Sequence, residues 1–201
     1  ERGYVLFLPR GSTSPARHQA WIDHLTGLGR TVFYFEYDDA QDVEDLRGSL
    51  PRLMDLFHDR HPESADELGG GRYWIVGEGR GTKFAVMATT TLLNAGKRLP
   101  GAYVFIDPSS ITRREWVALL GWDSRWKELP VETFLLGVCT EAASGEAQGS
   151  LERFFDATKS IPPVQKQILV LPRQPTGGSI PPDGDPLWEV VDELLERSGS
   201  D

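Results

Sequence analysis

The sequence predicts an α/β fold: a three-layer sandwich in which helices cover both faces of a mostly parallel sheet of about six strands. Short apolar runs alternate along the chain with stretches of helical periodicity, which is the pattern of repeated strand–helix units. Most of these runs are apolar at every position, as in strands that are buried on both faces. The chain has 201 residues, of which 39% are hydrophobic, and this size fits a single domain over residues 1–201.

The expected strands are apolar and several are rich in β-branched and aromatic residues, which favour the extended backbone of a sheet. The second of them, TVFYFE, combines both kinds of side chain. The strands are expected at residues 4–8, 31–36, 73–76, 103–106, 134–138 and 168–171.

The expected helices carry apolar residues three and four positions apart, which places these residues on one helical face. In the first helix this pattern is formed by Trp21, Leu25 and Leu28. In the second, Pro51 is expected to kink or divide the helix. The helices are expected at about residues 16–28, 43–58, 82–95, 151–158 and 187–195, and the small, polar residues 141–150 are expected to form a loop.

Two segments differ in composition from the strand–helix pattern. Residues 109–130 contain Trp116, Trp122 and Trp126 and lie where a doubly wound fold places a helix between two strands. They form either that helix, packed on the sheet through its tryptophans, or a cap over a pocket. Residues 172–186 are rich in proline and glycine and are expected to form a loop.

Charge and hydropathy exclude several classes of partner. The formal net charge is -9, which argues against nucleic acids and against anionic membranes. No apolar run approaches the roughly 20 residues of a membrane span, and no signal peptide is recognised, so a cytoplasmic location is expected.

Cysteine and histidine usage gives no sign of a metal or cofactor site, and none is expected. Cys139 is the single cysteine, which excludes an intramolecular disulfide and a cysteine-rich metal site. Because Cys139 follows an apolar strand, a buried structural thiol is expected rather than a nucleophile. His58 and His61 are interpreted as the solvated end of a helix.

The residues Gly77-Glu78-Gly79-Arg80-Gly81 join a strand to a helix through a glycine-rich turn. This pattern resembles the nucleophile elbow G-x-S-x-G of the α/β-hydrolase family, with Gly79 in the position of the serine. The resemblance extends over most of the chain and implies a minimal form of that fold, lacking its first two strands, with strand order 2-1-3-4-5-6. It also implies that Gly79 lies at a sharp strand-to-helix turn.

The resemblance assigns further positions. Gly11 and Arg80 would supply the backbone amides of an oxyanion hole, and Arg10 stands where many members have histidine. Glu141 is the nearest candidate for the family acid. The catalytic histidine is expected after the last strand, but the loop there contains none, and the four histidines are His18, His24, His58 and His61.

Without a nucleophile at Gly79 and without that histidine, serine hydrolysis is not expected. The sequence therefore predicts a pseudoenzyme that is retained for binding a small anionic or apolar ligand or a protein partner. The alternative is an enzyme with other chemistry in the same crevice, such as a lyase, a cyclase or an acyl-handling enzyme, using Glu141, Asp107 or the hydroxyls of residues 12–14.

The first and third strands should meet at the topological switch point of the sheet, where ligands bind in α/β folds. Arg10, Gly11, Ser12 and Arg80 would then lie around one crevice and could bind an anion. Alternatively, Arg10 and Arg80 are surface arginines paired with acidic residues, which are Glu78, Asp38 or Asp107.

Asp107 directly follows the fourth expected strand and also has two interpretations. It is either a relocated catalytic acid or the cap of the turn that follows the strand.

Overall fold

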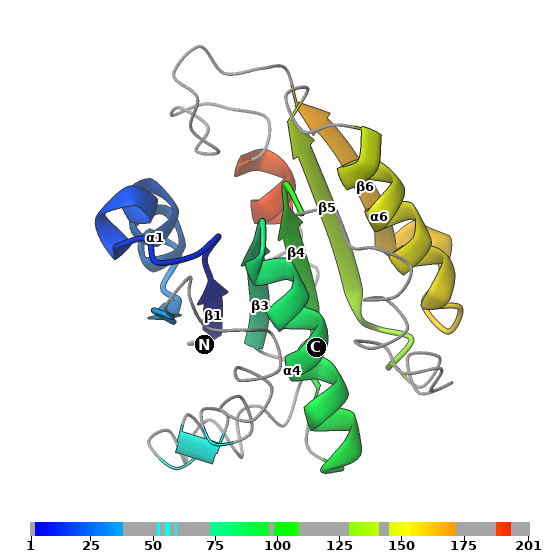
Figure 1. Ribbon diagram of the computed structural model, residues 1–201, viewed down its shortest axis with the longest axis horizontal. Helices are drawn as coiled ribbons and strands as arrows, with labels where there is room; N and C mark the ends of the chain where they lie inside the picture. The colour runs from blue at the N-terminus through cyan, green and yellow to red at the C-terminus, as the bar shows by residue number, and fades with distance from the viewer. Residues whose placement is uncertain are drawn as a thin grey trace.

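The computed structural model describes residues 3–37, 52, 55–56, 59, 73–96, 99–108, 129–140, 145–171 and 188–193. Its centre is a six-stranded sheet in the order β2-β1-β3-β4-β5-β6 (Figure 1). Every pair of neighbouring strands is parallel. The expected α/β sandwich and its strand order are therefore confirmed.

All six expected strands are present, and their bounds differ by a few residues at most. The second is shorter than predicted because its ladder with the first ends at Tyr34, although Phe35 still donates a backbone hydrogen bond of 3.0 Å to Phe7. The third is longer and includes Gly77 and Glu78. The strands are β1 (Tyr4–Leu8), β2 (Thr31–Tyr34), β3 (Tyr73–Glu78), β4 (Ala102–Ile106), β5 (Phe134–Thr140) and β6 (Lys166–Leu171).

The described helices are η1 (Pro15–His18), α1 (Gln19–Gly27), α4 (Gly81–Asn94), α6 (Gly145–Ala157) and η4 (Pro163–Gln165), and residues 188–193 are also helical. The first expected helix begins as a 3-10 turn because Pro15, which lacks an N–H group, suits a first helical position. The loop expected at 141–150 is wrong for residues 145–150, which belong to α6. Small polar residues are compatible with a helix here because Ala147, Leu151 and Phe154 form its buried face.

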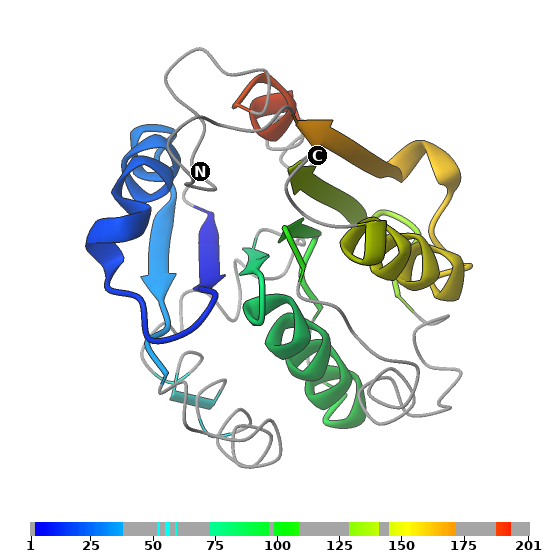
Figure 2. The ribbon, with the colours of Figure 1, turned by 45° about the horizontal axis from the view of Figure 1, so that its top comes forward.

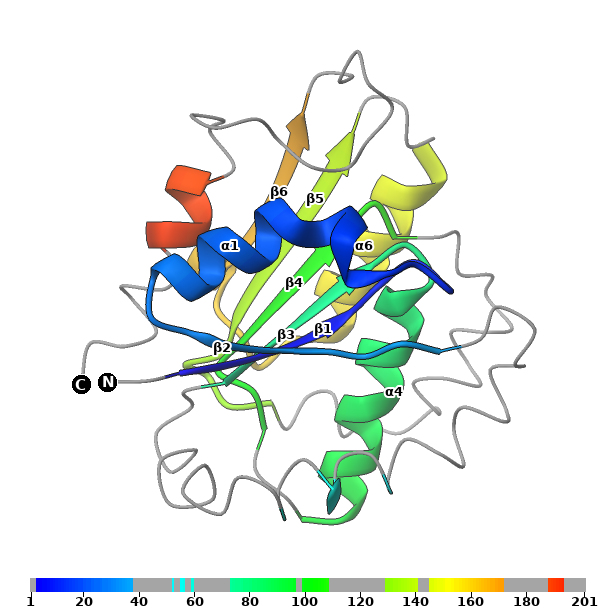
Figure 3. The ribbon, with the colours of Figure 1, turned by 90° about the vertical axis from the view of Figure 1, so that its left-hand side faces the viewer.

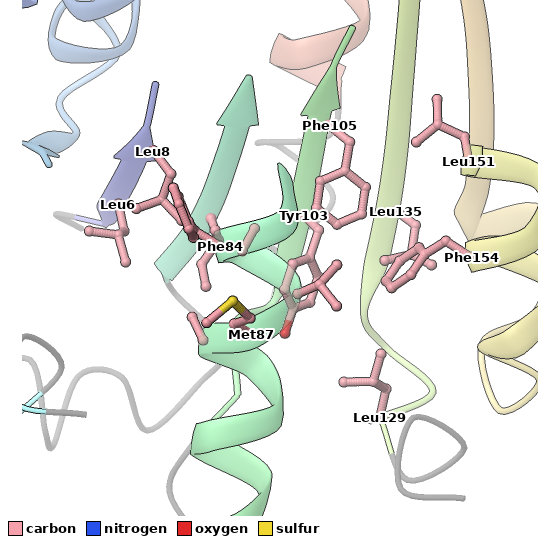
Figure 4. Close-up of a cluster of buried hydrophobic side chains, with 14 of the residues drawn as sticks. Leu6, Leu8, Phe84, Met87, Tyr103, Phe105, Leu129, Leu135, Leu151 and Phe154 are labelled. Atoms are coloured by element: carbon pink, nitrogen blue, oxygen red, sulfur yellow. The ribbon is translucent and has the colours of Figure 1, made fainter. Parts of the chain in front are cut away.

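The helices cover the two faces of the sheet as separate layers (Figures 2 and 3). On one face, α4 and α6 pack on the strands, with Phe84, Met87, Leu151 and Phe154 meeting Tyr103 and Phe105 of β4 (Figure 4). On the other face, α1 and residues 188–193 contribute Trp21, Leu25, Trp188 and Val191 to a second apolar core. These two cores fix the sheet, and with it the loops at the carboxyl ends of the strands.

Several expectations concern residues outside the described part of the chain. The helix expected at 43–58 is described only at residues 52, 55 and 56, which are helical. Residues 109–128, the loop 172–186, and Asp38, His58, His61 and Glu141 lie outside, so the choice between helix and cap for 109–130 stays a prediction. None of the helices in the described part is long and apolar enough to span a membrane.

Candidate functional site

The elbow is a sharp turn between β3, which ends at Glu78, and α4, which begins at Gly81. Gly79 forms the turn with a φ of 54°, in the left-handed region that glycine adopts without steric cost. Its N–H group donates a hydrogen bond of 2.8 Å to the carbonyl oxygen of Ile106, which ties the turn to the end of β4. The geometry around Gly79 is thus that of a strand-to-helix elbow.

The two outer glycines are required by close contacts with backbone atoms. A Cβ atom on Gly81 would lie 1.9 Å from the carbonyl oxygen of Leu8, and one on Gly77 would lie 2.8 Å from the Cα atom of Thr82. Neither neighbour can move without separating β1, β3 and α4. Glycine is therefore required at both positions because the strands lie so close to the helix.

The central glycine has a different neighbour, the side chain of Arg10. A Cβ atom on Gly79 would lie 2.9 Å from both Cγ and Nε of Arg10. The Nε atom also lies 3.9 Å from Oε1 of Glu78, within ion-pair distance. The exposed fraction of the Arg10 side chain is 57%, so one side of it faces solvent. Arg10 therefore lies across the apex of the elbow, and this contact matches the alternative in which Arg10 pairs with Glu78.

Glu78 is buried and forms a contact that the sequence analysis did not foresee. Its Oε2 atom lies 2.5 Å from Nε2 of His18, and both residues are buried. His18 ends η1, the turn that follows β1, and is 60 positions away from Glu78. The sequence analysis named no histidine for this place, and His18 lies beside the elbow. The available signal was the neighbourhood of β1 and β3, which brings the segment after β1 to the elbow.

The other ring nitrogen of His18 faces Tyr34, the last residue of β2. The Tyr34 hydroxyl lies 2.8 Å from Nδ1 of His18 and 2.9 Å from the carbonyl oxygen of Thr13. Because a hydroxyl carries one proton, Tyr34 donates either to His18 or to Thr13, and in the second case Nδ1 of His18 must donate to Tyr34. Glu78, His18 and Tyr34 thus form a continuous chain of groups that can exchange protons.

The side chains of His18 and Tyr34 have apolar and acidic surroundings. The ring of Phe7 lies 5.0 Å from that of His18 and is stacked at 5.5 Å on that of Tyr34. Burial raises the pKa of Tyr34, and the negative charge of Glu78 raises it further. Tyr34 therefore remains a neutral hydroxyl at neutral pH and can both donate and accept a hydrogen bond.

The other residues predicted for an anion site are near the elbow but differ in their surroundings. Gly11 is buried and accepts a backbone hydrogen bond of 2.6 Å from Thr13, while Ser12 is exposed. The guanidinium of Arg80 lies 5.7 Å from the centre of the Phe84 ring, on the first turns of α4. Arg80 is thus placed at the elbow with its charge over an aromatic face.

Asp107 and Cys139 lie at the same edge of the sheet. Asp107 directly follows β4, and Cys139 lies near the end of β5. Asp107 is buried and has a φ of 39°, a strained conformation for a residue other than glycine, and its N–H group donates to Val138 at 2.8 Å. Cys139 is buried as expected. Burial raises the pKa of its thiol to about 11, and the charges of Asp107 and Glu152 add to this effect. Cys139 is therefore protonated at neutral pH and is not an activated nucleophile.

No group of three or more potential metal ligands occurs among the residues that the structure describes. Glu141, the acid implied by the family resemblance, lies outside them.

No family model matches the chain, and no curated protein matches it in sequence. Solved structures, in contrast, superpose on nearly the whole chain. One is an esterase from Rhizomucor miehei, with a TM-score of 0.63 and 13% identity over 98% of this chain and 73% of that chain. Another is EstE7, a homologue of HSL from a metagenome library, with a TM-score of 0.63 and 15% identity over 98% of this chain and 79% of that chain.

A third structure is MGS-M1, an α/β-hydrolase enzyme from a deep-sea metagenome library, with a TM-score of 0.60 and 17% identity over 98% of this chain and 85% of that chain. The chain has an α/β-hydrolase-like fold. Because the identities are this low, the similarity establishes the fold alone.

Proposed function

We propose that this protein uses its α/β-hydrolase-like fold for binding rather than for hydrolysis, and that a ligand or a protein partner is received at the crevice around Gly79. The observation that carries the proposal is the kind of residue at the apex of the elbow. Glycine stands there in place of a nucleophile, and the Arg10 side chain lies across it.

The chemistry of the neighbouring groups supports this proposal. Acyl transfer needs a nucleophile that a base can deprotonate, and Gly79 has no side chain to attack a carbonyl. His18 is engaged at Nε2 by Glu78 and at Nδ1 by Tyr34. Cys139, whose pKa is raised, is a poor substitute.

The sequence predicts a small anionic or apolar ligand or a protein partner. The exposed side chain of Arg10 beside Gly79 supplies positive charge there, which suits an anion or an acidic surface.

A second candidate function is favoured by the contacts that link the buried Glu78 and His18 to the half-buried Tyr34. Carboxylate, imidazole and phenol groups in hydrogen-bond contact are the components of general acid–base catalysis. An enzyme of this kind, a lyase, a cyclase or an acyl-handling enzyme, would use His18 to move a proton without a covalent intermediate.

Hydrolysis of p-nitrophenyl acetate and butyrate by the wild type, His18→Ala and His24→Ala tests the proposal. His24→Ala is the matched control because His24 also contacts a carboxylate, that of Asp192 at 2.8 Å, but lies in α1. We expect all three proteins to give the same rate as buffer. Turnover by the wild type that His18→Ala abolishes and His24→Ala retains would refute the binding-only function and favour the enzyme.

A further inference from the structure

We propose that the outer edge of β2 is an interface with a second copy of this chain, in which the two β2 strands pair antiparallel across a two-fold axis at Phe33. The inference goes beyond the binding function proposed for the crevice, and neither depends on the other. It assigns an interaction surface to residues 30–36 and names the partner that fits it.

β2 is the last strand on one side of the sheet, and within the described part of the chain it pairs with β1 alone (Figure 3). Thr31 and Phe35 each donate a backbone hydrogen bond of 3.0 Å towards the β1 side. Because the backbone groups of a strand alternate in direction along a parallel ladder, those of Val32 and Tyr34 point away from β1. Their N–H groups and carbonyl oxygens therefore line the outer edge of the sheet, where a further strand can bind.

The residues of this edge favour pairing with another strand. Residues 31–35 are β-branched or aromatic and carry no charge. Thr31 and Glu36 are exposed, so solvent reaches both ends of the edge. Many sheet edges avoid association through a lysine or a proline within the strand, and β2 contains neither.

The charges at the two ends of β2 select a second copy as the partner. Arg30 directly precedes the strand, and Glu36 lies two positions after its end. In antiparallel pairing centred on Phe33, Arg30 of each copy lies opposite Glu36 of the other, and their side chains share one face of the sheet. The same register places Val32 opposite Tyr34, whose outward backbone groups can then exchange hydrogen bonds. One register therefore satisfies both the charges and the backbone.

Neither of these two charges has an ion-pair partner among the residues that the structure describes. Arg30 is half-buried, and its guanidinium lies 5.6 Å from the centre of the Trp74 ring. A guanidinium over an aromatic face keeps N–H groups at its rim that can donate to a carboxylate. Glu36 of the second copy supplies that carboxylate.

The opposite edge of the sheet does not offer this match. β6 contains Lys166 but no acidic residue. The ammonium group of Lys166 donates hydrogen bonds of 2.7 and 2.6 Å to the carbonyl oxygens of Phe155 and Thr158 at the end of α6. Antiparallel pairing of two β6 strands would therefore gain no ion pair within the strands, which favours β2 as the interface.

The experiment measures self-association of the full chain by analytical ultracentrifugation, together with amide hydrogen exchange at low and high protein concentration. Glu36→Arg places like charges opposite each other in the proposed register, and so does Arg30→Glu. Glu132→Arg is the matched control because Glu132 is also exposed, lies before β5 and gives the same change in net charge as Glu36→Arg.

We expect the wild type to dimerise and Glu36→Arg to raise the dissociation constant about tenfold, because two attractive contacts become repulsive. Glu132→Arg should dimerise like the wild type. A mixture of Glu36→Arg with Arg30→Glu should form a mixed dimer, since opposite charges then face each other again at both positions.

Hydrogen exchange of the wild type decides the proposal even where Arg30→Glu fails to fold. The amides of Val32 and Tyr34 should exchange about tenfold more slowly in the dimer, whereas that of Phe35, which already donates towards β1, should not change. A wild type that stays monomeric at about 1 mM, a dimer that Glu36→Arg leaves unchanged, or exchange at Val32 and Tyr34 that is independent of concentration would overturn the proposal.

Discussion

Two histidine–carboxylate pairs lie on the same face of the sheet, and their surroundings differ. His24 of α1 contacts Asp192 at 2.8 Å, and their side chains are 22% and 40% exposed. His18 contacts Glu78 at 2.5 Å, and their side chains are 7% and 6% exposed. The first pair joins two helices at the surface, with the His24 ring stacked on Trp188. The second pair lies at the elbow of the fold, next to Gly79.

Burial, more than the identity of the residues, decides what such a pair can do. At the surface, water and salt screen the two charges, and the pair mainly positions one helix against another. At the elbow, water is largely excluded, so the attraction between the two side chains is screened much less. Of the two pairs, the buried one is therefore the candidate for a functional role.

The largest difference is expected when the carboxylate of each pair is removed. Glu78→Ala should lower the free energy of unfolding by about 3 kcal/mol because it leaves the buried His18 without its carboxylate partner. Asp192→Ala should cost less than about 1 kcal/mol. Urea unfolding of both variants measures the difference, and equal costs would show that burial does not distinguish the two pairs.

Cys139 is a buried titratable group at the same edge of the sheet. It should make the free energy of unfolding depend on pH in the alkaline range. Its pKa is raised from the ordinary 9.0 to about 11, so the unfolded thiol ionises first as the pH rises. The stability that it contributes is complete below pH 9 and is lost towards pH 11, a loss of about 1 to 2 kcal/mol.

This prediction is checked by urea unfolding of the wild type and Cys139→Ala at several pH values. The free energy of unfolding should fall more steeply in the wild type between pH 9 and 11. Parallel curves would contradict the assignment of this loss to Cys139.

Tyr34→Phe removes the hydroxyl that contacts His18. The substitution leaves the stacking on Phe7 in place but deprives His18 and Thr13 of their contacts with the hydroxyl. We expect a loss of about 1 kcal/mol in urea unfolding and a change in the His18 ring nitrogen shifts. Unchanged ring nitrogen shifts would mean that Tyr34 is not hydrogen-bonded to His18 in solution.

Salt should produce the smallest effect. Raising the ionic strength to about 1 M shortens the screening length to about 3 Å and should remove a few tenths of a kcal/mol from the coupling between His24 and Asp192. The coupling between His18 and Glu78 should stay the same. Double-mutant cycles at low and high salt measure both values, and a salt-sensitive His18–Glu78 coupling would indicate that water reaches the buried pair.

Much of the fold could be predicted because it depends on local patterns. The six strands are apolar runs, and the glycines at 77, 79 and 81 mark a turn that needs close contacts and a positive φ. The early start of α6 could not be predicted from the small, polar residues at 145–150, because its buried face appears only when Ala147 is aligned with Leu151 and Phe154.

The site was predicted only in part. The pairing of Arg10 with Glu78 was one of the alternatives that the sequence left open. The contact between His18 and Glu78 did not, because it depends on the direction in which η1 turns after β1 and spans 60 positions. The left-handed conformation of Asp107 likewise depends on tertiary contacts, since its N–H group bonds to Val138 on the neighbouring strand.

The central claim is that the elbow binds a ligand or a protein partner and holds no nucleophile. Incubation of the wild type, His18→Ala and His24→Ala with a fluorophosphonate, followed by intact-protein mass spectrometry, tests this claim most directly. The absence of a covalent adduct on all three proteins is the predicted result. A single adduct on the wild type and on His24→Ala that is lost in His18→Ala would contradict it, because it would reveal a nucleophile activated by His18.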